Sequence, residues 1–286
     1  MKRIVITTES GTDLPAERAQ ALDIRIIPMW VVTEGRSRQD GSFPAGEVFT
    51  YYKKTKTVPS TSAVNPQEYM EFFKELRREK PDADILHIAY SSKASSTWQN
   101  ASIAIKELND PGIFLADSLN VSGGISLICE KAAQIAGRAA DGKAALEELE
   151  SWIRRARVTF LPDSLEFLKA GGRVSNAAYL GASLLQLKPQ ILIRDGLLVA
   201  SRKYRGKMDA VAVPYLEDFV RNNSLDREDL YLFYTDGFSM NLLELLEKRA
   251  GELGFCNVRR AMCGCVISCH GGPGALGIAG FAQEGH

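Results

Sequence analysis

Apolar and polar positions in the first part of the chain alternate between two kinds of segment. Short apolar or β-branched runs between polar stretches predict strands, and longer segments with apolar residues every three or four positions predict helices. The expected strands span 3–7, 24–32 (interrupted at Pro28), 84–89 and 113–116, and the expected helices span 13–21, 44–54, 66–80, a segment after Thr97 that ends at 108, 123–140 and 143–157. This order predicts a mainly parallel sheet with helices on both faces.

After residue 156 the pattern changes to shorter strands, and Asp195-Gly196 between two apolar runs is a strong hairpin signal. The expected strands are 158–161, 190–193, 197–201, 229–235, 256–261 and 265–269, followed by a tight turn at 270–274 and a closing segment at 275–281. The expected helices are 163–170, 176–188, 208–222 and 238–253. We therefore expect an α/β protein with two lobes, an α/β/α domain over 1–156 and a mixed-sheet α/β domain over 157–286, with a ligand cleft between them.

Composition narrows the classes of function. The formal net charge is zero and the sequence pI is about 6.8, without a long basic run, which argues against nucleic acid or an anionic membrane as a partner. The start, MKRIVITTES, is typical of a strand rather than of a signal peptide, and no apolar run approaches the ~20 residues of a membrane span. A cytoplasmic protein without stable membrane insertion is expected.

The five cysteines are an odd number, which favours reduced thiols in a chain that is not secreted. Cys263, Cys265, Cys269 and His270 resemble a metal site in their spacing. However, the three cysteines fall at even spacing in an apolar run, on one face of the expected strand, and paired C-x-x-C knuckles are absent. We expect small buried cysteines and no metal.

Polar loops leave the carboxyl ends of several predicted parallel strands, which is where ligands bind in such sheets. These loops are Glu9–Asp13, Tyr90–Thr97 and Asp117–Asn120, and the hydroxyl-rich loop around Ser60–Ser62 can lie beside them. By themselves, the serines and threonines in these loops are as well explained by helix capping and turns. Gly171-Gly172 and the glycines of 271–274 fit turns better than phosphate-binding loops.

A nucleophilic serine would need a histidine, and the chain has only His87, His270 and His286. His87 falls inside a predicted strand, and His286 is the last residue. A lipid hydrolase or acyltransferase that uses His270 with Ser95 is therefore the enzymatic alternative. No G-x-S-x-G elbow supports it.

Taken in order, these segments resemble the DegV family over essentially the whole chain. The segments that carry the resemblance are TTESGTDL at 7–14, Thr61-Ser62, SSKASSTWQNA at 91–101, ADS at 116–118, LKAGGRVS at 168–175, Lys188-Pro189 and HGGPGA at 270–275. Each match is weak alone, but six or more in the right order make a specific pattern.

The resemblance implies a carrier, not an enzyme, that binds a long-chain fatty acid such as palmitate in a buried tunnel between two lobes and uses no cofactor. It implies that Thr61 and Ser95 hold the carboxylate, with Ser62, Arg173 and His270 close to the head group. It also implies that Arg205 docks a separate fatty acid kinase, which converts the bound fatty acid to an acyl phosphate for phospholipid synthesis. A purely regulatory sensor of a small molecule is a third interpretation.

The chain departs from the family pattern at several site positions. Ala63, Ala94, Ser96 and Gly271 stand where the family has a glutamine, a leucine, a glycine and a hydroxyl residue, and Glu9 stands where it has an aspartate. The two expected carboxylate ligands are retained. Chain length and saturation of the ligand are not predicted from these residues.

Overall fold

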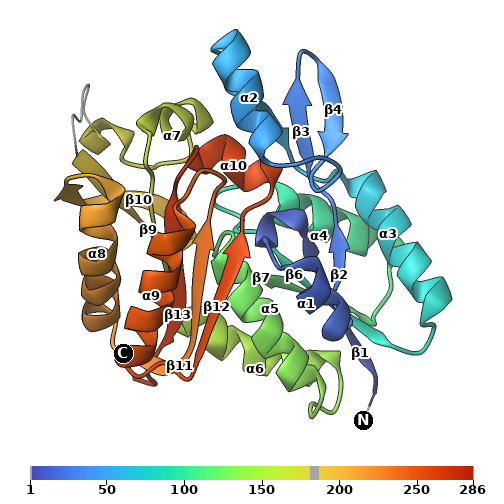
Figure 1. Cartoon of the computed structure of the whole chain (residues 1–286). Helices are drawn as coiled ribbons and strands as arrows, with labels where there is room; N and C mark the ends of the chain where they lie inside the picture. The colour runs from blue at the N-terminus through green and yellow to red at the C-terminus, as the bar shows by residue number, and fades with distance from the viewer. Residues whose placement is uncertain (1, 181–186, 286) are drawn as a thin grey trace.

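The computed structural model describes residues 2–180 and 187–285, and its first part contains a four-stranded parallel sheet (Figure 1). The strand order in this sheet is β2 (Arg25–Ile27), β1 (Ile4–Glu9), β6 (Asp84–Ala89) and β7 (Ile113–Asp117). Helices α5 (Gly123–Ala136) and α6 (Gly142–Arg155) pack on one face, and α3 (Pro66–Glu79) and α4 (Thr97–Leu108) cover the other. The predicted parallel sheet with helices on both faces is confirmed.

The second part contains a six-stranded mixed sheet. Its order is β10 (Leu197–Arg205), β9 (Leu187–Arg194), β8 (Ala156–Leu161), β13 (Leu276–Ala282), β11 (Leu225–Tyr234) and β12 (Asn257–Met262), and only β11 and β12 run parallel. Helices α8 (Met208–Asn222) and α9 (Met240–Glu252) pack against it. Asp195 and Gly196 both have positive φ, 50° and 80°, which is the geometry of the two-residue hairpin turn that their sequence predicts.

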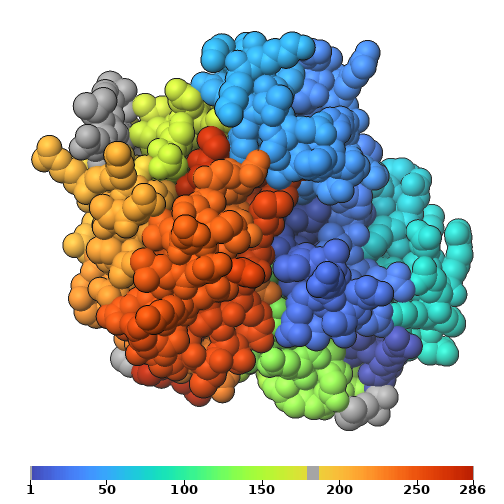
Figure 2. All heavy atoms as spheres, viewed as in Figure 1, coloured from blue at the N-terminus to red at the C-terminus, as the bar shows by residue number. Residues whose placement is uncertain are grey.

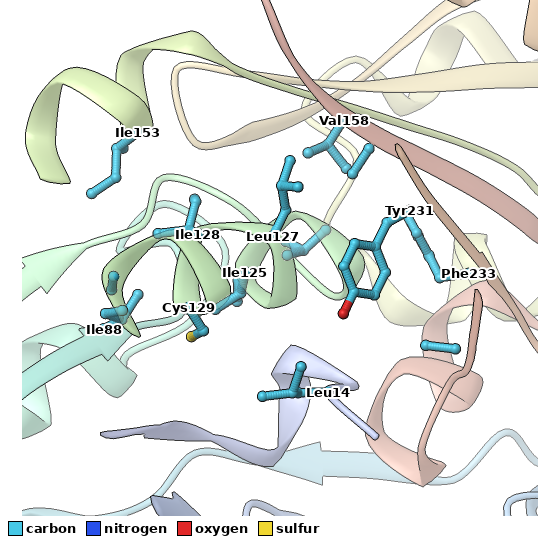
Figure 3. Packing of buried hydrophobic residues seen from close by; sticks show 14 of the residues in the cluster. Leu14, Ile88, Ile125, Leu127, Ile128, Cys129, Ile153, Val158, Tyr231 and Phe233 are labelled. Atoms are coloured by element: carbon cyan, nitrogen blue, oxygen red, sulfur yellow. The ribbon is translucent and has the colours of Figure 1, made fainter. Parts of the chain in front are cut away.

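Helix α5 packs against both sheets, which explains why it is buried on almost every side. Gly123 and Gly124 let its first turn approach the mixed sheet, because a Cβ at these positions would lie 2.4 Å from Phe233 and from Val158, respectively. Figure 3 shows Ile125 and Ile128 of this helix in one cluster with Tyr231 and Phe233 of β11. The largest core is therefore shared by the two sheets, and a domain boundary at 156 stays a prediction.

A small third sheet lies outside both predicted sheets. The predicted strand 24–32 is wrong as a single element, because it divides at Pro28 into β2 and β3 (Trp30–Thr33), which belong to different sheets. Strand β3 pairs with β4 (Arg36–Gln39) and β5 (Ser60–Ser62), neither of which is among the expected strands. The short polar strands β4 and β5 lack the apolar alternation by which a strand is recognised. Between them, α2 (Gly46–Thr55) confirms the helix predicted at 44–54.

One predicted element near the site is wrong, and a second is wrong in the part that the structure describes. Residues 265–269 are not a strand, because Cys265–Gly271 form helix α10, which also takes up the first two residues of the predicted turn. The helix predicted over 176–188 is a short 3-10 helix at Ala177–Leu180, and β9 has already begun at Leu187. The part between them lies outside the described residues. Pro189 fits in β9 because its partner there is Lys203, beside an irregularity in the β9–β10 pairing.

Among the described residues, no helix is long and apolar enough to cross a membrane. The space-filling view shows the first third of the chain, in blue and cyan, on one side and the last part, in orange and red, on the other (Figure 2). At the top of this view α2 meets α7 (Leu165–Gly171), where the rings of Tyr52 and Phe167 lie 4.8 Å apart.

Candidate functional site

A cavity of about 290 Å³ lies where the two parts of the chain meet. All five residues predicted to bind a ligand line it: Thr61, Ser62, Ser95, Arg173 and His270. The other lining residues are Met29, Ala63, Tyr90, Ala94, Ser96, Leu198 and Val266. The structure therefore brings together residues that are up to 209 positions apart in the sequence, as Thr61 and His270 are.

Thr61 is placed by β5, an edge strand of the small sheet. It pairs with Val31 of β3, and its side chain is less exposed than those of Ser60 and Ser62, because neighbouring residues of a strand point to opposite faces. Its Oγ1 lies 2.9 Å from Nε2 of His270. If His270 donates this hydrogen bond, the hydroxyl hydrogen of Thr61 is left to donate to a ligand.

Ser95 lies in the loop that leaves β6, at the carboxyl edge of the parallel sheet. The loop is shaped by backbone hydrogen bonds from Ala94 and Ser95 to the carbonyl of Ser91, at 3.0 and 3.1 Å. Its Oγ accepts a hydrogen bond from the backbone N–H of Thr97 at 3.3 Å. Since this contact uses only a lone pair of the oxygen, the hydroxyl hydrogen of Ser95 can also donate to a ligand.

His270 lies near the carboxyl end of α10 and is held in the neutral form. Burial lowers its pKa to about 4, and the nearby positive charge of Arg173 acts in the same direction. Its Nδ1 is enclosed and has no hydrogen-bond partner among the described residues. Gly171, the last residue of α7, allows this close approach, since a Cβ there would lie 2.5 Å from Nδ1. A neutral imidazole can donate to Thr61 without adding a charge to the cavity.

Arg173 is exposed and follows the left-handed Gly172 that ends α7. Its Nη1 donates to the carbonyl oxygen of Gly171 at 2.5 Å, so one part of the guanidinium is used as a helix cap. The same side chain lines the cavity and supplies its positive charge.

A second, apolar pocket of about 50 Å³ adjoins the first cavity. The two share Tyr90, Leu198 and His270 as walls. The remaining lining comes mainly from the mixed sheet and α10 and includes Phe160, Phe233, Ile267, Leu276 and Gly277. A polar compartment and an apolar one therefore lie side by side, an arrangement that suits an amphiphilic ligand.

The predicted partner-binding residue lies apart from these cavities. Arg205 is exposed at the end of β10, an edge strand of the mixed sheet, and lines neither cavity. Its role stays a prediction, as do the roles of the five cavity residues.

The cysteines do not lie on one strand face as expected. Cys263 follows β12, whereas Cys265 and Cys269 lie in α10, and none of the five cysteines forms a disulfide. No group of three or more His, Cys, Asp or Glu residues in the described ranges could hold a metal ion.

One known protein family has a sequence pattern that matches almost the whole chain. The model of the DegV family, described as an uncharacterised protein family, matches residues 3–283. The chain belongs to the DegV family.

A DegV domain-containing protein of Caldanaerobacter subterraneus subsp. tengcongensis is 29% identical over 99% of this chain and 100% of its own length. A protein of Thermotoga maritima named fatty acid-binding protein is 28% identical, with 96% of each chain covered. A DegV family protein of Thermus thermophilus, whose solved structure is described by its fatty acid binding, is similar with a TM-score of 0.87 and 26% identity, over 98% of this chain and 100% of that one.

Four of the five positions at which this chain departs from the DegV pattern fall on the cavity walls, and Glu9 does not. Ala63, Ala94 and Ser96 line the polar cavity, and Gly271 lines the apolar pocket. Smaller side chains at 63 and 94 leave more room beside the predicted carboxylate ligands.

Many residues that line this site were not predicted from the sequence. The sequence does offer a signal for Tyr90, because this residue directly follows a strand and lies in the same loop as Ser95. Phe233 and Leu198 carry no such signal, because they are ordinary apolar strand residues whose position beside the cavity depends on the packing of the whole chain. The carboxylates of Asp13 and Asp40, which contact the start of α10, also carried no signal that points to α10.

Proposed function

We propose that this protein binds a long-chain fatty acid between its two lobes and presents the carboxylate to a separate fatty acid kinase, which forms an acyl phosphate for phospholipid synthesis. The observation that carries the proposal is the pair of adjoining cavities, one lined by hydroxyls and one apolar. Fatty acid binding by the relatives from Thermotoga and Thermus supports it. In this proposal the protein is a cytoplasmic carrier that needs no cofactor and does not insert into the membrane.

In this proposal, burial of the acyl chain in the apolar pocket drives binding of the fatty acid. Each methylene removed from water contributes about 0.8 kcal/mol, so a chain of about 14 methylenes contributes on the order of 10 kcal/mol before the cost of ordering. Pockets for ligands of comparable size enclose roughly 300–1,000 Å³. Because the apolar pocket measures only about 50 Å³, we expect side chains that line it, such as Ile267 of α10, to move when the acyl chain enters.

The polar cavity accounts for recognition of the head group. A buried carboxylate needs donors, and the hydroxyls of Thr61 and Ser95 both have a hydrogen that can donate. These donors are neutral, and the guanidinium of Arg173 donates a hydrogen bond to the backbone carbonyl of Gly171. A carboxylate held by neutral donors remains nucleophilic enough to be phosphorylated, whereas a bidentate arginine would hold its charge more strongly.

The enzymatic alternative, a hydrolase or acyltransferase with His270 and Ser95, has less support. The hydrogen bond of His270 is with Thr61, and a catalytic histidine also needs a group that orients its second nitrogen. Nδ1 of His270 has no such partner among the described residues. Hydrolysis of short acyl esters that is lost in Ser95→Ala would favour this alternative.

Arg205→Glu is expected to reduce acyl phosphate formation by a separate fatty acid kinase on the order of tenfold, because a reversed charge at the rim of an interface slows association. Fatty acid affinity should not change, since Arg205 lines neither cavity. The measurement supplies the kinase with loaded protein and ATP and follows acyl phosphate as its hydroxamate. Lys143→Glu, an equivalent reversal on the exposed face of α6, is the control. Equal rates for both variants would remove Arg205 from the docking surface.

A further inference from the structure

Two aspartates from the first part of the chain hold the start of α10. Asp13 accepts a hydrogen bond from the backbone N–H of Gly264 at 2.7 Å, and Asp40 accepts one from Cys265 at 2.7 Å. Gly264 is the N-cap residue and has no side chain with which to cap the helix itself. Because His270 lies in the same seven-residue helix, about 10 Å long, the two carboxylates help to set its position beside Thr61.

The two carboxylates lie close together and are both buried. A Cβ on Gly264 would be 2.9 Å from Asp40 Oδ1 and 3.4 Å from Asp13 Oδ1. In the parts of the chain that the structure describes, neither aspartate has an ion pair. The charged and titratable groups that face them are Cys263, Cys265, Cys269 and Tyr90. Arg38 acts on Cys265, and Arg173 acts on Tyr90.

Asp13 also lies directly behind the apolar pocket. Its carboxylate accepts a hydrogen bond from Ser122, and the Oγ of Ser122 lies 3.7 Å from the Sγ of Cys263. Ser122 and Cys263 both line the pocket. An acyl chain in this pocket would displace water beside these two residues and would make ionisation of Asp13 still less favourable. The negative head group of the ligand would act in the same direction.

We propose that Asp13 takes up a proton when a fatty acid binds, so that loading of the carrier is linked to pH. This inference rests on the proposed function, because it concerns the same pocket. Asp13 is then a positioning residue that holds α10 in both of its protonation states.

Both protonation states of Asp13 can keep the same contacts. In the ionised form Ser122 donates to the carboxylate, and in the neutral form the carboxyl donates to Ser122, while Gly264 donates to Oδ1 in either case. Burial, with Asp40 as a smaller contribution, raises the pKa of Asp13 to about 7, so a change in its surroundings alters its charge near neutral pH.

Asp13→Asn imitates the neutral form. The amide can donate to Ser122 and accept from Gly264, and asparagine tolerates the left-handed backbone of this position, where φ is 56°. If the role of Asp13 were purely structural, the fatty acid affinity of this variant would be lower at every pH. The proposal instead predicts that at pH 6 the variant binds fatty acid with the affinity of the unchanged protein. Above pH 6 the affinity of the variant should not show the decrease that ionisation of Asp13 causes in the unchanged protein.

The experiment is calorimetric titration of the delipidated protein with palmitate, from pH 6 to pH 8, in buffers of different ionisation enthalpy. From a pKa of about 7, uptake should be about half a proton per ligand at pH 7 and approach one at pH 8, in excess of Asp13→Asn. Affinity should fall by up to about fivefold between pH 7 and pH 8 relative to the variant. Subtracting the variant removes the titration of the palmitate carboxylate itself. Asp40→Asn, which removes the neighbouring charge, should shift the midpoint to lower pH.

Failure of the proposal is distinguishable from failure of the carrier function. Tight binding with equal proton uptake by the protein and Asp13→Asn would overturn the proton linkage and leave the carrier function standing. No palmitate binding at any pH would overturn both. Without ligand, the melting temperature of the unchanged protein should fall relative to that of Asp13→Asn between pH 5 and pH 7, because the folded state holds the proton of Asp13 up to a higher pH than the unfolded state does. Parallel melting curves would contradict the proposal independently of any ligand.

Discussion

The double variant Thr61→Ala, Ser95→Ala is expected to bind long-chain fatty acid at least roughly 100-fold more weakly than the unchanged protein. A hydrogen bond to a charged group contributes about 1.5–3 kcal/mol, and loss of two such bonds leaves a buried carboxylate without its main donors. Removal of the Thr61 hydroxyl also leaves Nε2 of His270 without its partner. The measurement is the dissociation constant of the delipidated protein for palmitate, determined by titration calorimetry.

The control for this variant is Ser60→Ala, Ser92→Ala. These serines lie in the same strand and the same loop as Thr61 and Ser95, but neither lines the cavity. This control should keep its affinity. If the two double variants bind equally well, the carboxylate is held elsewhere and the assignment of Thr61 and Ser95 is wrong.

Gly277→Ala is expected to lower the free energy of unfolding by about 3 kcal/mol or more, at the upper end of the usual cost of overpacking a core. Gly277 lies in β13, and a Cβ there would be 1.9 Å from Cε2 and 2.2 Å from Cζ of Phe233. The ring cannot easily move away, because it also packs against Gly123. Denaturant unfolding measures the effect.

Two further variants show whether the contact with Phe233 is the cause. Gly251→Ala in α9 meets no atom within 4 Å and should be neutral or more stable by up to about 1 kcal/mol, because alanine favours helices. Phe233→Leu combined with Gly277→Ala should recover part of the lost stability, which a double-mutant cycle measures. Additive effects of the two substitutions would show that the ring and the glycine do not interact.

Most of the two main sheets and the polar part of the site could be predicted from the sequence, because their signals are local. Asp195-Gly196 has the turn chemistry of a hairpin, and the serines of 91–97 follow a fully buried strand. The five predicted cavity residues do line one cavity, which the order of family motifs implied and periodicity alone did not.

The elements that the sequence did not predict depend on distant contacts. The alternation of Cys263, Cys265 and Cys269 favours a strand, but Cys265 and Cys269 lie in a helix. The first backbone N–H groups of this helix donate hydrogen bonds to the carboxylates of Asp13 and Asp40. Those partners are more than 220 positions away. Similarly, β5 is a strand only because β3 pairs with it, since its three residues are Ser, Thr and Ser.

Native mass spectrometry of the purified protein, followed by organic extraction, tests the central proposal most directly. The account predicts one long-chain fatty acid per chain, released on extraction, and a strongly reduced amount in the Thr61→Ala, Ser95→Ala double variant. A protein that carries no lipid and also fails to bind added palmitate after delipidation would contradict the carrier function.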